Sequence, residues 1–361
     1  MVAGKLGRMV AAIFIVSFLT FALAKALPGD PALIVLGTSS GTMIPCATNP
    51  GPSTANDSSV ADCRGIPHSK LHPRGAVGPA PLVQKCDAAQ CVLARDQFLH
   101  QHHLDLPIMR QYAQWVGGAL HGDFGTTYDA APERVSHQIA QALPATIELM
   151  ILAEVVALLF AIPLGVYSAY RENKLGDKVA TGFSFLALAI PNFVLAIFLV
   201  LFFVVALGWL PLLYTPWSQD PVKNVKSIII PVIALAAGTI AVFARLLRSD
   251  MIATLQEDFI LMARAKGLPP MQVLFRHALR PSSFSLLTVA GINLGALIGG
   301  TVIIESMFVV NGLGYLLIAA IEARNFPVIQ AVVLLITAVF VIINVLVDII
   351  YSLLDPRIRH A

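Results

Sequence analysis

Two carboxylates, Glu148 and Glu154, lie within a long apolar stretch at residues 143–170. Burying a carboxylate among apolar residues is costly, and such a group by default marks a transport pathway or a polar partner. Glu154 is therefore a candidate to meet a positively charged part of a substrate, and Glu148 is a second candidate. The competing interpretation is a protonated Glu, or a hydrogen bond inside a helix bundle.

The cysteines and most histidines gather in one polar segment. The four cysteines predict two disulfides in an oxidising space, with three pairings open, because their spacing matches no zinc pattern. They are Cys46, Cys63, Cys86 and Cys91. His100, His102 and His103 could bind a metal, but a solvated surface is the favoured interpretation, and we expect no metal.

Motifs for catalysis are missing from the sequence. It contains no G-x-x-x-x-G-K-[ST], no H-E-x-x-H and no G-x-S-x-G. We therefore expect no enzymatic site and no cofactor, so that any ATP would be hydrolysed by another subunit.

The longest basic segment, residues 248–280, has a turn at its centre. Gly267 and Pro269 favour a turn between two amphipathic helical stretches. A short helix there could lie along the membrane and fit a groove on a cytoplasmic protein, or it could bind lipid headgroups. The basic residues available for either role are Arg264, Lys266, Arg276 and Arg280.

The composition determines the elements that must position these residues. The chain of 361 residues is 57% hydrophobic and 12% charged, which excludes an ordinary soluble enzyme. A net charge of +3 gives no reason to expect nucleic-acid binding. We predict an all-α membrane protein with six transmembrane helices, kinked at Pro163, Pro191 and Pro231. The six apolar stretches are 9–27, 143–170, 179–210, 227–247, 282–304 and 328–354.

The charge distribution predicts the orientation. With the N-terminus inside, the inner segments carry more Lys and Arg than Asp and Glu, whereas the outer segments carry slightly more acids than bases. Both termini are thus expected in the cytoplasm. For the first stretch, a retained helix is favoured over a cleaved signal peptide ending near Ala24.

This arrangement gives three parts: an N-terminal segment with the first span (1–29), an outer loop or cap (30–142), and a membrane core (143–361). Residues 37–81 are rich in Gly, Pro, Ser and Thr and should be largely irregular. In the fifth stretch, Gly291, Gly295 and Gly299 form overlapping G-x-x-x-G motifs that allow close helix contact. The partner is a sister chain or another span of this chain, and Asn293 faces a pore or joins two helices.

Several sequence blocks in one order resemble the permease subunits of binding-protein-dependent ABC importers, and most closely the B-type subunit of dipeptide and oligopeptide transporters. The inner loop is similar to the family's EAA loop, although the triplet itself is Leu261-Met262-Ala263. The matching blocks are Pro28–Pro31, Leu104–Pro107, Gln111-Tyr112, Gly122–Gly125, Asp258-Phe259, Ala263–Leu268, Arg276–Arg280, Glu305, Phe308, Gly312–Gly314, Asp348–Tyr351 and Leu354–Arg357.

The resemblance implies a function. The inner loop would form a coupling helix that seats in an ATPase subunit, involving Asp258, Ala263, Arg264, Ala265, Lys266, Gly267, Arg276 and His277. The chain would form half of a pore in a bacterial cytoplasmic membrane. Its partners would be a second permease, two ABC ATPases, an extracytoplasmic solute-binding protein and a peptide substrate.

Two alternatives stay open. Related permeases carry other solutes, such as nickel complexes, heme or small glycans. A proton-coupled secondary transporter that uses Glu154 is the other alternative. The insert at residues 39–91 has no counterpart in the family, so its role and the docking of an external partner are not predicted.

Overall fold

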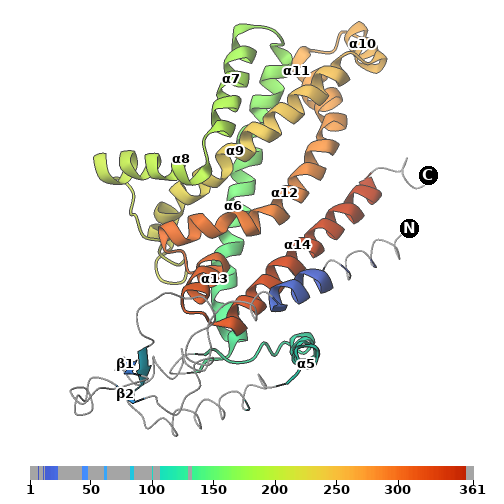
Figure 1. Ribbon diagram of the computed structural model, residues 1–361. Helices are drawn as coiled ribbons and strands as arrows, with labels where there is room; N and C mark the ends of the chain where they lie inside the picture. Colours follow the sequence, from blue (N-terminus) through green and yellow to red (C-terminus); the bar gives the residue numbers. More distant parts are fainter. Residues whose placement is uncertain are drawn as a thin grey trace. The chain divides into compact units, whose positions relative to one another are not determined.

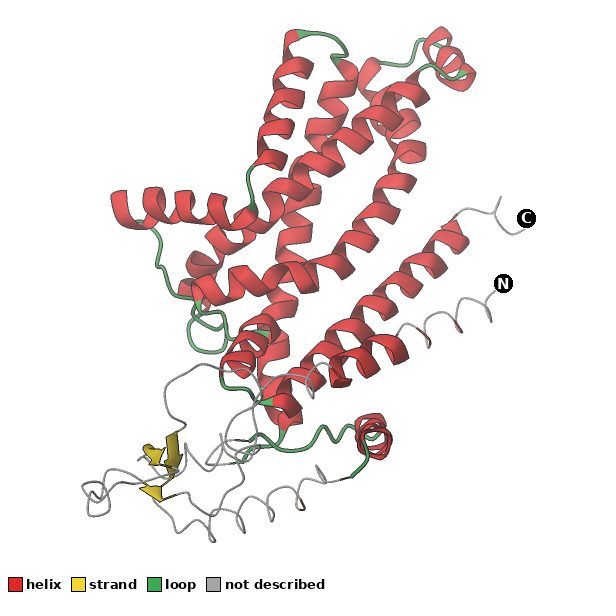
Figure 2. Ribbon diagram, in the orientation of Figure 1, coloured by secondary structure: helices red, strands yellow, loops and turns green. Residues whose placement is uncertain are grey.

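The computed structural model describes residues 13–22, 106–128 and 132–354, together with residues 7, 11 and 100 and three short strands at 43–47, 61–62 and 82–84. The chain divides into two compact units. The core unit comprises residues 1–9, 139–318 and 335–361, and the second unit comprises residues 10–138 and 319–334. Within the described part of the core unit, all regular structure is helical (Figure 2).

Long apolar helices build the core unit (Figure 1). Four helices of the described residues are long and apolar enough to cross a membrane. They are α6 (Val135–Tyr170), α9 (Pro221–Leu255), the continuous helix Pro270–Phe308, and residues Phe326–Val347 of α14 (Phe326–Leu354). The helix Pro270–Phe308 contains α11 (Pro270–Gln272), the π-helical turn η2 (Val273–Ala278) and α12 (Leu279–Phe308).

The third expected span is broken rather than kinked. α7 (Leu175–Ala189) and α8 (Asn192–Leu199), which continues into the π-helix η1 (Val200–Ala206), meet at an angle of 100°. Pro191 explains the break, because a proline disfavours helical backbone at the preceding residue, and Ile190 is extended. Pro163 and Pro231, by contrast, stay inside α6 and α9.

The bent pair counts as a fifth span at most. For the first expected span, the structure describes a shorter apolar helix, Ile13–Ala22, so the count of six spans stays a prediction. A further short apolar helix, α13 (Leu313–Glu322), lies between α12 and α14 and was not expected.

α9 begins with a well-formed cap. The carboxylate of Asp220 accepts hydrogen bonds from the backbone N–H groups of Val222 and Lys223 at 3.0 and 3.1 Å. These contacts satisfy donors that have no partner in the first turn of a helix. The backbone N–H of Lys223 is also the main reason that the pKa of Asp220 lies below its ordinary value.

The second unit contains both helices and a small sheet. Strands β1 (Met43–Ala47), β2 (Ala61–Asp62) and β3 (Leu82–Gln84) have the order β2-β1-β3, with β1 parallel to β2 and antiparallel to β3. The prediction of an all-α protein therefore omits a small sheet. The prediction that residues 37–81 are largely irregular stays a prediction, because most of them lie outside the described residues. Helix α5 (Ile108–Leu120) starts directly after Pro107. Its Tyr112 hydroxyl lies 2.6 Å from that of Ser17 in helix Ile13–Ala22.

Candidate functional site

The predicted turn of the basic segment ends a short helix, α10 (Asp258–Ala265). Gly267 has φ +74°, a left-handed conformation that favours glycine. Its N–H donates to the carbonyl of Arg264 at 2.9 Å, and the Leu268 N–H donates to that of Ala263 at 3.4 Å. These two bonds form a Schellman motif, which fixes the end of α10 and explains the glycine.

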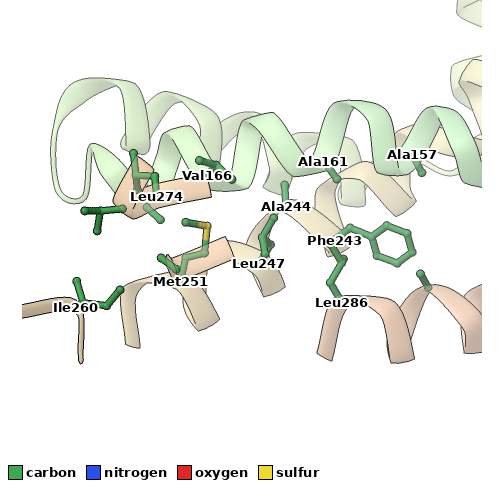
Figure 3. Packing of buried hydrophobic residues seen from close by; sticks show 14 of the residues in the cluster. Ala157, Ala161, Val166, Phe243, Ala244, Leu247, Met251, Ile260, Leu274 and Leu286 are labelled. Carbon is green, nitrogen blue, oxygen red and sulfur yellow. The ribbon is translucent and has the colours of Figure 1, made fainter. Parts of the chain in front are cut away.

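α10 is held to the core unit by one side. Ile260 is fully buried and Ala263 nearly so. Figure 3 shows Ile260 beside Met251 of α9, with Leu274 of η2 and Val166 of α6 in the same cluster. The same cluster extends to Leu286 of α12, so a displacement of α10 would disturb a packed core that three long helices share.

The other side of α10 is exposed and largely apolar. Phe259, Leu261 and Met262 are 45%, 54% and 59% exposed. Arg264, Ala265 and Lys266 are exposed around them, as is Asp258 at the start of the helix. An apolar surface rimmed by charged residues is typical of a protein contact. Of the other candidates in this segment, Arg276 is exposed and His277 half-buried, both in η2.

Hydrogen bonds join the two ends of this segment. The hydroxyl of Ser282, at the start of α12, donates to the hydroxyl of Thr254 near the end of α9 at 2.9 Å. One turn further along α12, the Ser285 hydroxyl donates to the carboxylate of Asp250 in α9. α9 and α12 are therefore linked at the base of the loop that carries α10.

An ion pair lies near the same end of the core unit. Arg248 of α9 donates to both carboxylate oxygens of Asp177 in α7, from Nε at 2.5 Å and from Nη2 at 2.7 Å. The side chain of Asp177 is 4% exposed. A bidentate pair of this kind fixes both distance and orientation between the two helices. The sequence gives no sign of this ion pair, because its residues are 71 positions apart.

Glu154 of α6 forms a hydrogen bond with a residue of α12. The side-chain amide of Asn293 donates to Glu154 Oε2 at 2.8 Å, so these two predicted residues lie together. The other oxygen, Oε1, is buried and has no hydrogen-bond partner among the described residues. A buried acceptor without a partner is costly. The site is thus a helix–helix contact with one oxygen available for a further donor.

Glu305 is fully buried at the far end of α12. Its Oε1 accepts from the hydroxyl of Thr146 in α6 at 2.9 Å. Its Oε2 accepts from the backbone N–H groups of Gly314 and Tyr315, at the start of α13, at 2.7 and 3.1 Å. Thr146 in turn accepts from the Leu313 N–H at 2.8 Å. Glu305 and Thr146 together therefore accept hydrogen bonds from three backbone N–H groups at the start of α13.

Two glycines make this network possible. A Cβ on Gly312 would lie 2.4 Å from Glu305 Oε2, and a Cβ on Gly314 would lie 2.5 Å from the backbone Cα of Val302. A side chain at Gly312 would therefore displace the side chains of Glu305 and Thr146, whereas one at Gly314 would require the backbone to move. The resemblance had marked Glu305 and both glycines. Thr146 was missed, because a lone threonine in an apolar run gives no sign of its partner.

Glu148 has a different environment from Glu154. The Tyr214 hydroxyl donates to Glu148 Oε2 at 2.7 Å. Burial raises the pKa of Tyr214 above its ordinary value, and the adjacent Glu148 raises it further. The backbone N–H of Tyr214 also donates to the Phe308 carbonyl at 3.2 Å. Glu148 thus belongs to contacts that fix the segment before α9 near the end of α12.

The glycine motif of α12 has two kinds of position. A Cβ on Gly291 would overlap the side chain of Val347 at 2.2 Å, and one on Gly295 would approach Phe340 at 3.1 Å. Both contacts are with α14 of this chain. Gly299 and Gly300 instead face open space among the described residues.

Some predicted residues cannot be placed. Cys63, Cys86 and Cys91 lie outside the described residues, and Cys46 is described only by its backbone in β1. His102 and His103 also lie outside them. Within the described part of the chain, no group of three or more His, Cys, Asp or Glu residues is arranged to hold a metal.

Several known proteins align with this chain over most of its length. The family model described as "Binding-protein-dependent transport system inner membrane component" matches residues 161–360. A putative peptide transport system permease protein of Brucella abortus (strain 2308) is 34% identical over 357 residues, covering 99% of this chain and 98% of the relative. The oligopeptide transport system permease protein AppB of Bacillus subtilis (strain 168) is 36% identical over 285 residues, covering 78% of this chain and 90% of AppB.

A solved structure has a similar fold. A chain of the inward-facing MetNI methionine ABC transporter matches with a TM-score of 0.50 and 17% identity. The match covers 60% of this chain and 96% of the other. At this identity, the similarity concerns the helical arrangement alone.

Proposed function

The chain belongs to the family of binding-protein-dependent transport system inner membrane components, the permease subunits of ATP-driven ABC importers, and we propose that its cargo is a dipeptide or oligopeptide. It would form half of the pore beside a second, homologous permease. Two ABC ATPase subunits and an extracytoplasmic solute-binding protein would complete the importer.

The cargo is inferred from the relatives and from Glu154. Two of the matching relatives are named as peptide and oligopeptide permeases. A peptide carries a positively charged amino terminus, and the free Oε1 of Glu154 is an acceptor for such a group. Asn293 would hold the carboxylate in place through the other oxygen.

Coupling to ATP hydrolysis rests on α10. Its exposed residues Phe259, Leu261 and Met262 would seat in an ATPase subunit. Its buried Ile260 belongs to the same packed cluster as residues of α6, α9 and α12. This shared cluster is the observation that carries the proposal, because it would transmit a movement of α10 directly to the helices around Glu154.

The proposed orientation places α10 in the cytoplasm, together with both termini. The support is the excess of Lys and Arg in the segments at that end, which include the turn before α7 and residues 264–280. The segment that carries the cysteines would then face the solute-binding protein on the outside.

Peptide uptake by the reconstituted importer tests the cargo assignment. The complex is purified from its native membrane, partners are identified by mass spectrometry, and uptake of labelled peptides into proteoliposomes is measured. We expect ATPases and a second permease to co-purify, and Glu154→Gln to reduce uptake more than the matched change Glu148→Gln. Uptake of a nickel complex or heme in place of peptides would contradict the cargo, and a chain that transports without any ATPase would contradict the coupling.

A further inference from the structure

A hollow of about 490 Å³ opens between α7 and α9. Thr181 and Phe185 of α7 line one side, and Arg245, Arg248 and Ser249 of α9 line the other. The hollow thus combines two guanidinium groups with the hydroxyl of Ser249, whereas the hydroxyl of Thr181 donates to Asp177 Oδ1 at 3.5 Å. Hydroxyl and guanidinium N–H groups together are suited to oxyanions such as phosphate.

The two arginines differ in their partners. The charge of Arg248 is balanced by Asp177, but this pairing uses only two of its five N–H donors. The guanidinium of Arg245 lies over the ring of Phe185, with 4.6 Å between its Cζ and the ring centroid. Among residues 106–128 and 132–354, no carboxylate forms an ion pair with Arg245. Arg245 therefore brings to the hollow a positive charge that no described carboxylate pairs, whereas Arg248 interacts with Glu172 as well as with Asp177.

Part of the lining is apolar and exposed. Phe185 of α7 and Val242 of α9, which both line the hollow, are 56% and 43% exposed. Lys178, nearer the start of α7, is exposed as well. Apolar side chains next to cationic groups at the end of membrane helices are the arrangement that an anionic lipid requires, since the acyl chains and the headgroup need different surroundings.

We propose that the hollow between α7 and α9 binds the phosphate group of an anionic phospholipid. Arg245 supplies the uncompensated charge, Arg248 and Ser249 supply further donors, and the acyl chains cover Phe185 and Val242. The inference rests on the proposed function for its membrane setting and for assigning the lipid to the inner leaflet. A bound lipid would join α7 to α9, the helix that leads into the coupling segment.

Native mass spectrometry of the complete importer in mild detergent tests this site. Phosphatidylglycerol, phosphatidylcholine and inorganic phosphate are added in separate arms. We expect more retained phosphatidylglycerol than phosphatidylcholine, and about a tenfold weaker retention in Arg245→Ala, the size expected for one lost charge-assisted contact. Lys226→Ala, which removes an exposed cation near the other end of α9, is the matched control and should retain the lipid.

Arg245→Lys separates charge from a general loss of structure. It keeps the positive charge and should retain more phosphatidylglycerol than Arg245→Ala; an equal loss in both variants would overturn the proposal. Arg248 is less suitable than Arg245 as a position for testing lipid binding, because its substitution would leave the buried Asp177 without its ion-pair partner.

Other outcomes would also overturn the lipid assignment. Equal retention of both lipids would do so, as would displacement of phosphatidylglycerol by inorganic phosphate in an Arg245-dependent way, which would identify free phosphate as the ligand. Retention by the isolated chain but not by the importer would show that a protein partner covers this face. Peptide uptake is measured in the same preparations, so an importer that transports peptides without retaining lipid contradicts this inference alone.

Discussion

The hydroxyl of Thr146 donates a hydrogen bond to Glu305 Oε1 at 2.9 Å, across 159 residues of sequence, and accepts one from the backbone N–H of Leu313 at 2.8 Å. One threonine therefore joins α6 to both the end of α12 and the start of α13. The carboxylate that completes the network is fully buried. This arrangement makes the stability of the core unit depend on a few polar atoms.

Replacing Glu305 by Gln should destabilise the permease. The amide retains only one acceptor oxygen and turns N–H donors toward the donors of Thr146 or of α13. We expect a loss of about 1–3 kcal/mol, visible as a lower Tm of the purified protein. Glu322→Gln, at an exposed position, is the control and should leave Tm unchanged. An unaltered Tm in Glu305→Gln would show that the network contributes little.

Gly314→Ala should be destabilising for a steric reason. The new methyl group would lie 2.5 Å from the Cα of Val302, and a backbone atom cannot rotate away. A loss of about 1–3 kcal/mol is the cost expected for overpacking. Gly299→Ala is the matched control in α12, because no atom of the described residues lies within 4 Å of the place its new methyl group would take. Thermal unfolding compares the two variants, and equal Tm values would contradict this interpretation of the packing.

Arg248→Ala should cost about 3 kcal/mol, because it leaves the buried Asp177 without its partner. The double variant Arg248→Ala with Asp177→Asn should recover part of this loss. Both are measured by thermal unfolding in detergent. Lys223→Ala, which breaks the exposed pair with Asp220, is expected to have little effect. A double variant less stable than Arg248→Ala would refute the coupling between the two charges.

Met262→Asp should weaken binding of the ATPase subunit. The side chain is 59% exposed on α10, so a charge there can be accommodated in the isolated permease but not in an apolar contact. The measurement is the amount of ATPase that co-purifies with the tagged chain. Leu213→Asp, at a 58% exposed position outside the helices, is the control and should retain the ATPase. Full retention with Met262→Asp would place the contact elsewhere.

Sequence periodicity and composition predict the long helices α6, α9, α12 and α14 well. In a membrane, a continuous apolar stretch can form all its backbone hydrogen bonds internally only as a helix. The turn at Gly267 was also predictable, because Gly and Pro restrict the backbone locally. Pro191 was predicted to kink a single span, but the size of its effect, a 100° break between α7 and α8, was not predicted.

The polar contacts were much less predictable. Glu154 and Asn293 were both candidates, yet their hydrogen bond joins residues 139 positions apart, and no local pattern specifies such a pair. Gly291, Gly295 and Gly299 follow one another at the same four-residue spacing. Gly291 and Gly295 lie against α14, whereas Gly299 does not. Spacing shows that close contact is possible, whereas the tertiary fold decides which position makes it.

Gly267→Asp is the sharpest test of whether α10 couples ATP hydrolysis to peptide uptake. The residue has φ +74°, so a side chain there strains the end of α10 without touching the polar contacts of Glu154 or Glu305. ATP-driven uptake of a labelled peptide is measured in proteoliposomes that contain the complete importer. We predict that the variant inserts into the membrane normally but loses uptake. Uptake equal to that of the unmodified importer would contradict the account.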